Sequence, residues 1–305
     1  QKNISKQKLS ISNHEGRLTF KSHHPDSDSC ISPLFKEKKL NKINGWRNKK
    51  VKRLAKILGD PSKLLSTEEA FTLIQQVNKI IDSEKYRQLN SDHQPGGVLS
   101  IPDNMKAIIM GDLHTCLDNL LTILSQNNFL EALENNEACL IILGDAVHPE
   151  IEGQYDKMTS SMLIMDIIFK LKCHFPENVF YLCGNHDSFS EHLSKRGVPQ
   201  GLLWGKELKK SRGKQYKKAM QKFYDNSAYL AYSRHFICCH AGPPTTEVDL
   251  QALVNIKHDP ILIKDLISNR LHNPHRLSGY KKSDIKTLRH SLGVATHTPD
   301  RKSVV

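Results

Sequence analysis

Apolar runs of strand length recur along the chain, and each ends at a small residue or a turn. The runs, with the residues that follow them, are AIIMGD at 107–112, LIILGD at 140–145, VFYLCGNHD at 179–187, HFICCHAG at 235–242 and GVATHT at 293–298. Each is followed by a carboxylate, carboxamide or imidazole side chain. The pattern predicts buried strands whose ends bring polar groups together along one rim of a sheet.

Apolar positions at helical spacing fill the intervals between these runs. Residues 117–133 and about 152–175 are dense in such positions, which indicates core helices. Ahead of the first run, residues 46–58 predict a short basic helix, and Ser66 with Glu69 three residues later predicts a capping box on a longer one. The order strand, helix, strand, helix, strand is typical of parallel βαβ units, so the fold class is α/β.

The charge is distributed unevenly along the 305 residues. Residues 1–63 carry 16 Lys/Arg against 5 Asp/Glu, and residues 195–222 carry 10 against 1, although the whole chain has a net charge of +12. The rest of the chain is therefore acidic, as a cluster of metal ligands would make it. We expect contact with an acidic protein or a membrane surface through residues 1–63, with a solvated tail as the simpler alternative. Nucleic acid is not an expected partner.

Charge composition and a stretch of glycine and proline residues divide the chain into three parts. Residues 1–45 read as a basic irregular arm and 46–97 as N-terminal helices ending in the linker QPGG, while 98–305 form the catalytic domain with a basic helical insertion at 195–222. No apolar run approaches the length of a membrane span, and no signal peptide is expected. Seven cysteines, mostly in predicted core elements, indicate reduced thiols and a cytoplasmic protein.

The polar residues at the strand ends have the types that two divalent cations require. Two cations about 3.5–4 Å apart can clamp an in-line displacement at phosphorus and acidify the attacking water. The predicted ligands are Asp112, His114 and the bridging Asp145 for the first ion, and Asp145, Asn185, His240 and His297 for the second. His186 follows Asn185 directly, which suits a general acid. A single GD or NH pair is usually only a turn, but the ordered series favours a metal site.

Three of these stretches carry a family resemblance. LIILGDAVH, FPENVFYLCGNHD and HFICCHAGPP resemble the central motifs of the PPP-type (serine/threonine) phosphoprotein phosphatases of the metallophosphoesterase superfamily, over about residues 107–297. The resemblance implies a calcineurin-like β-sandwich flanked by helices, two divalent ions (Mn, Fe or Zn) and a phosphoprotein or phosphopeptide substrate. A further likeness to bacterial effector-type members would place the protein in a host cell.

The chain departs from these phosphatases beside the bridging aspartate. The family has an acidic residue and then a phosphate-binding arginine, where this chain has His148 and Pro149. We therefore expect the usual partner of the general acid to be missing, and one phosphate clamp to be missing or supplied from elsewhere. Arg276, within NPHRLSG, corresponds to the family's second arginine, with Arg270 as the alternate. The expected catalytic residues are His186, Asp187, which replaces the family's glutamate, and Arg276.

The predicted function is that of a metal-dependent phosphoprotein phosphatase that hydrolyses phosphoserine and phosphothreonine, with room for phosphotyrosine. A hydrolase of nucleotides or dinucleoside polyphosphates is an alternative, because HAGPP also resembles that branch. A nuclease is disfavoured, because nucleases of the superfamily typically carry a second histidine in the last motif, where THTP has one. A non-catalytic scaffold that binds partners through the basic arm is the remaining alternative, against which the complete ligand set argues.

Overall fold

The computed structural model describes residues 8–14, 17–23, 49–126, 128–273, 275 and 278–294. Within the basic arm, β1 (Lys8–His14) and β2 (Arg17–His23) pair in antiparallel register. The expectation of an irregular arm is therefore wrong for these two segments, where apolar and polar residues alternate with the period of a strand. The rest of the arm lies outside the described residues.

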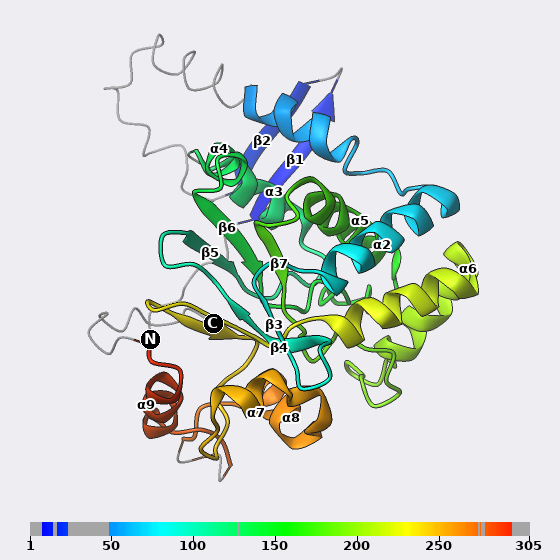
Figure 1. The fold of residues 1–305 in the computed structure, drawn as a ribbon. Helices are drawn as coiled ribbons and strands as arrows, with labels where there is room; N and C mark the ends of the chain where they lie inside the picture. The colour runs from blue at the N-terminus through cyan, green and yellow to red at the C-terminus, as the bar shows by residue number, and fades with distance from the viewer. Residues whose placement is uncertain are drawn as a thin grey trace.

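Two sheets form the centre of the molecule (Figure 1). The first has the parallel order β5 (Lys106–Met110), β6 (Ala138–Ile142) and β7 (Val179–Tyr181). The helices α3 (Leu117–Ser125) and α4 (Phe129–Glu134) connect β5 to β6, and α5 (Thr159–His174) connects β6 to β7. The predicted parallel βαβ units are confirmed, although the first helical stretch is divided in two and the second begins later than expected.

The second sheet has mixed strand directions. Its order is β3 (Arg87–Leu89), β4 (Pro95–Ser100), β8 (Leu230–Tyr232) and β9 (Ile237–Cys239), with β4 and β8 parallel and the outer pairs antiparallel. A parallel bridge from Leu182, just after β7, to Ala228, just before β8, joins the two sheets. The strand that leads to His240 thus belongs to a second sheet, as predicted.

Successive residues of the central strands face two different cores, which is why these strands read as continuous apolar runs. In β6, Leu140 and Ile142 pack toward the helices, while Cys139 and Ile141 pack toward the second sheet. The outer face of the second sheet packs on α7 (Leu250–Val254) and α8 (Pro260–Ser268).

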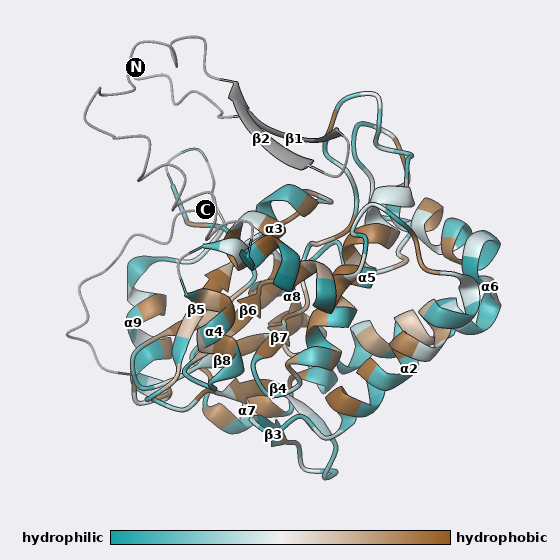
Figure 2. Ribbon diagram, turned by 90° about the horizontal axis from the view of Figure 1, so that it is seen from above, coloured by the Kyte–Doolittle hydropathy of each residue, from teal (hydrophilic) through white to brown (hydrophobic). Residues whose placement is uncertain are grey.

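The two sheets therefore lie face to face between two helical layers. Figure 1 shows α2 (Thr67–Asp82), α5 and α6 (Gln200–Asn226) beside the first sheet, and α7 and α8 beyond the second. In Figure 2, hydrophobic residues dominate the central strands β6 and β7, whereas much of α6 is hydrophilic. This α/β sandwich flanked by helices is the predicted fold.

The helices largely follow their sequence signals. Residues 49–58 are helical, and Ser66 and Glu69 form the predicted capping box at the start of α2. The basic insertion forms most of α6, which is kinked at Gly213, where φ is 87°. Among the helices that the structure describes, none combines the length and the apolar character that a bilayer crossing requires.

The segment QPGG is not a linker. Its last three residues begin β4, and the expected domain boundary at 97/98 falls inside that strand. A Cβ atom on Gly97 would lie 2.2 Å from Ile256 Cγ2, so the glycine allows the layer of α7 to approach the sheet closely. Here glycine serves packing and not flexibility.

The first two residues of the predicted fifth strand, Gly293 and Val294, do not form a strand. Gly293 has a φ of 63° and ends α9 (Lys282–Ser291), and its N–H donates to the carbonyl of His290. The N–H of Val294 donates to the carbonyl of Arg289, which completes a helix C-cap. The remainder of that run, including His297, lies outside the described residues.

Candidate metal centre

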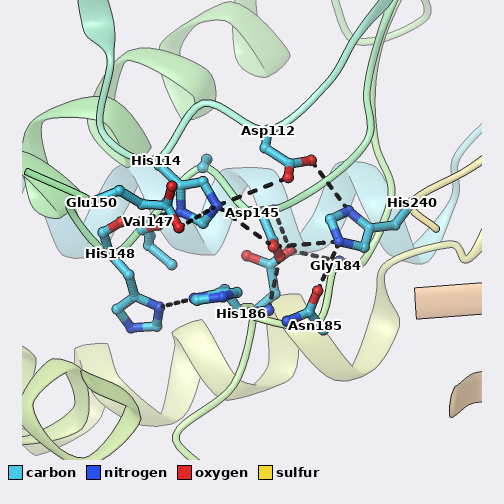
Figure 3. Close-up of polar contacts among 12 residues, drawn as sticks. Asp112, His114, Asp145, Val147, His148, Glu150, Gly184, Asn185, His186 and His240 are labelled. Atoms are coloured by element: carbon cyan, nitrogen blue, oxygen red, sulfur yellow. Dashed lines mark hydrogen bonds and ion pairs between the residues drawn. The ribbon is translucent and has the colours of Figure 1, made fainter. Parts of the chain in front are cut away.

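The ends of four strands converge on one site (Figure 3). Asp112 and His114 follow β5, Asp145 follows β6, Asn185 and His186 follow β7, and His240 follows β9. The carboxyl ends of parallel strands meet at one edge of a sheet, and the facing sheet brings β9 to the same edge. Five of the six predicted ligands thus come together, and the sixth, His297, lies outside the described residues.

Asp145 lies at the centre of this cluster and is 2% exposed. Its backbone is in the left-handed region, with φ 49°, and its N–H donates to Asp187 Oδ2 at 3.2 Å. Its Oδ1 accepts from the backbone N–H of His186 at 2.7 Å. A Cβ atom on Gly184 would lie 2.1 Å from Asp145 Oδ1, so only glycine permits this approach of the GNHD turn. The carboxylate is therefore held by the backbone N–H of His186, and the backbone of Asp145 is held by Asp187.

The other oxygen of Asp145 faces two imidazoles. Its Oδ2 is 3.3 Å from His240 Nε2 and 4.0 Å from His114 Nε2. Each ring donates its Nδ1–H to backbone carbonyls: His240 to Leu143 O at 2.8 Å, and His114 to His148 O at 3.1 Å. Metal-binding histidines are commonly oriented by such an outer contact, which leaves the Nε2 lone pair for the ion. This arrangement fits a cation beside Asp145.

Two sets of side chains can each bind one ion. One is His114, Asp145 and His186, the other is Asp112, Asp145 and His240, and the ligand atoms within each set lie within 4.8 Å of one another. Asp145 belongs to both, as a bridging carboxylate would. The Asp112 carboxylate lies between the two rings, 3.7 Å from His240 Nδ1 and 3.9 Å from His114 Nε2, so its assignment to the first ion stays a prediction. Asn185 Oδ1 lies 2.9 Å from His240 Nε2.

The electrostatics of the cluster favour a positive charge beside Asp145. Burial opposes protonation of His240, yet the hydrogen bond to Asp145 and its negative charge outweigh burial and raise the pKa of His240 to about 9. Burial likewise acts to raise the pKa of Asp145, but His240 outweighs it and lowers that pKa. For Asp187, burial and then the charge of Asp145 raise the pKa to about 7. Asp145 is thus the anion of the buried pair and attracts a cation.

His186 has a partner that the sequence analysis did not expect. Its Nδ1 lies 3.2 Å from Nδ1 of His148, the residue that replaces the family's acidic residue. His148 is fully buried, and its backbone N–H donates to Ser161 Oγ at 3.0 Å. The usual acidic partner is absent, as expected, and an imidazole lies in its place. On its other side, His186 packs edge-on against His114 at 4.8 Å between ring centroids.

Two further residues at the rim escaped the sequence analysis. Glu150 Oε1 lies 3.6 Å from His114 Nε2, and Lys195 Nζ donates to the same oxygen. Glu150 closes the altered motif GDAVHPE, and Lys195 opens the basic segment. Glu150 and Lys195 come together only in the folded chain, so neither position alone indicated a residue of the site.

The arginine assignment stays a prediction. Arg276 lies outside the described residues. The alternate, Arg270, is exposed, and its guanidinium donates to the carbonyl of Asn269 at 3.3 Å. Pro149 is buried and offers no side-chain donor, and its carbonyl accepts from Gln200 Nε2 at 3.0 Å.

Comparisons with known proteins agree with this fold. The family model described as calcineurin-like phosphoesterase matches residues 105–298. A comparison with curated proteins gives no match. Among solved structures, a protein serine/threonine phosphatase from Saccharomyces cerevisiae with similarity to human phosphatase PP5 aligns with a TM-score of 0.51 at 15% identity. The alignment covers 72% of this chain and 65% of that one, so this chain spans just under two thirds of its neighbour. At this identity the likeness concerns the fold.

Proposed function

The chain belongs to the calcineurin-like phosphoesterase family, and on that premise we propose that it is a metal-dependent phosphoprotein phosphatase. The observation that carries the proposal is the place of Asp145, whose buried carboxylate faces the Nε2 atoms of His114 and His240. Carboxylate and imidazole ligands around a shared carboxylate suit a pair of Mn, Fe or Zn ions. The proposed ligands are Asp112, His114, Asp145, Asn185, His240 and His297. His186 lies close enough to His114 and Asp145 to bind an ion, but it is proposed to transfer a proton and not to be a ligand.

The protein's own groups orient the reaction. When bound, the ions would acidify a water molecule for attack on phosphorus and neutralise charge on the phosphoryl oxygens. The backbone N–H of His186 holds Asp145 Oδ1, so the carboxylate keeps its orientation toward the ligand imidazoles. His186 lies beside His114 and donates a proton to the oxygen of the leaving group. His148 keeps the His186 ring in position from the opposite side.

A phosphoprotein is the substrate that the sequence motifs support best. The stretches FPENVFYLCGNHD and HFICCHAG resemble the phosphoprotein phosphatase branch, and the yeast protein with a similar fold is a serine/threonine phosphatase. Pro149 in place of an arginine removes one large side chain from the rim. The pocket is therefore proposed to accept phosphotyrosine beside phosphoserine and phosphothreonine.

A substrate panel tests this proposal against its alternatives. The purified protein, supplemented in turn with Mn²⁺, Fe²⁺ and Zn²⁺, is assayed on para-nitrophenyl phosphate, on phosphoserine, phosphothreonine and phosphotyrosine peptides, and on diadenosine polyphosphates. The proposal predicts metal-dependent release of phosphate from the peptides. Preferential cleavage of the diadenosine compounds would favour the nucleotide branch. Metal binding without turnover of any substrate would favour a scaffold.

A further inference from the structure

An ammonium group lies at the rim of the metal centre. Lys195 Nζ donates to Glu150 Oε1, and that same oxygen is 3.6 Å from His114 Nε2. Figure 3 shows Glu150 beside His114, on the side of the ring away from His240. His114 Nε2 also faces Asp112 and Asp145, so the Lys195–Glu150 pair adjoins a proposed ligand atom of the metal centre.

Backbone and side-chain hydrogen bonds hold the segment that carries Lys195. Lys195 and Val198 exchange two backbone hydrogen bonds of 3.0 and 2.9 Å, immediately before α6 begins. At the first residue of α6, the buried amide of Gln200 donates to the carbonyls of Pro149 and Tyr155, at 3.0 and 3.1 Å. The segment that carries Lys195 is thereby tied to the segment that carries Glu150.

A second ion pair runs alongside the first. Arg196 Nη1 donates to Glu152 Oε1 at 2.8 Å, but these side chains are 65% and 83% exposed, against 37% and 44% for Lys195 and Glu150. Only the Lys195 pair contacts a residue of the metal centre. Lys195 therefore carries a charge at the rim of the metal centre, whereas Arg196 carries an ordinary surface charge and can serve as its control.

We propose that Lys195 binds a phosphoryl oxygen of the substrate, and that Glu150 positions its ammonium group when no substrate is present. The proposal rests on the proposed function and adds a residue of the basic insertion to its site. Pro149 supplies no donor on this side, whereas an ammonium group offers three. Partly exposed ion pairs contribute little to stability, so Lys195 can exchange a carboxylate for a phosphate dianion at small cost. A charge-assisted hydrogen bond to phosphate then forms within the site.

Binding of inorganic phosphate tests this inference directly. Isothermal titration calorimetry on the metal-loaded protein should show that Lys195→Ala weakens phosphate binding by about 10-fold or more, with a loss of kcat/KM of about 10²-fold, as for one preorganised electrostatic group. Lys195→Arg should recover most of both. Glu150→Gln should tighten phosphate binding, because the ammonium group loses its competitor. The matched control, Arg196→Ala, should bind phosphate as the wild type does.

The outcomes separate this inference from the proposed function. Equal phosphate affinity and equal kcat/KM in Lys195→Ala and Arg196→Ala would overturn the role of Lys195, with phosphatase activity intact. A second outcome is that Lys195→Ala binds phosphate more weakly than the wild type, while the wild type itself hydrolyses no phosphoprotein or aryl phosphate. That result would support the anion site and refute the proposed activity. Thermal unfolding of each variant shows whether the fold is retained.

Discussion

The Nδ1 atoms of His148 and His186 lie 3.2 Å apart, so the two rings share a hydrogen bond. The Nε2 atom of His148 is buried and has no hydrogen-bond partner among the described residues. Burial, reinforced by the charge of His186, lowers the pKa of His148 to about 3, so this ring is neutral. His148 is therefore an uncharged partner on the Nδ1 side of the His186 ring.

His148 is thus a positioning residue for the proposed general acid. We expect His148→Ala to lower kcat on phenyl phosphate, a substrate with a poor leaving group, by about 10²-fold, because the ring of His186 loses its orientation. His148→Asp should recover much of this loss, because a carboxylate also binds the Nδ1 side of the ring. Steady-state kinetics on the folded variants measures both. Wild-type kcat in His148→Ala would contradict the positioning role.

His186 itself is tested by the dependence on the leaving group. Without a general acid, His186→Ala should lose about 10²-fold or more in kcat on phenyl phosphate and on a phosphoserine peptide. The loss should be much smaller on para-nitrophenyl phosphate, because para-nitrophenolate needs little protonation. The ratio of the two rate losses is the measurement. Equal losses on both substrates would show that His186 acts otherwise than as an acid.

A buried charge network stabilises the strand that leads to the GNHD turn. Glu84 accepts from Arg87 Nη2 at 2.7 Å and from Lys172 Nζ at 2.5 Å, and Lys172 Nζ also donates to Val179 O, in β7, at 2.7 Å. Burial acts to raise the pKa of Glu84, but Lys172 and Arg87 outweigh burial and lower it below 4.5. The stabilisation is therefore present above pH 4.5 and is lost as the pH falls below it.

Glu84→Gln should lower the free energy of unfolding at pH 7 by about 3–5 kcal/mol, because it removes one partner of a buried ion network. The loss should shrink as the pH falls through the lowered pKa of Glu84 in the folded wild-type protein. Denaturant unfolding at pH 7 and at a series of pH values below 4.5 measures this change. The matched control is Glu177→Gln, which removes the exposed pair with Lys85 and should cost about 0–1 kcal/mol. Similar losses in the two variants would contradict the structural role of Glu84.

Five residues predicted to share a site lie together at the strand ends, and the sequence could indicate them because its signals are local. Each ligand follows an apolar run, and a strand buried on both faces is apolar throughout, so strand ends can be read directly from the residues. The linker predicted at QPGG is wrong because Gly97 serves packing, and a close approach between two layers cannot be recognised from the local residue pattern. The contacts of His148 with His186, and of Glu150 with Lys195, join residues 38 and 45 positions apart. Such pairings depend on how the chain folds and not on spacing.

The central claim is that the buried carboxylate of Asp145 bridges two divalent ions, and metal content measures it most directly. Elemental analysis of the purified, active protein should find about two ions of Mn, Fe or Zn per chain. Asp145→Asn should keep the fold, as judged by circular dichroism, while losing most of this metal and all measurable turnover. Active wild-type protein without any such ion, or Asp145→Asn with full metal content and wild-type turnover, would contradict the account.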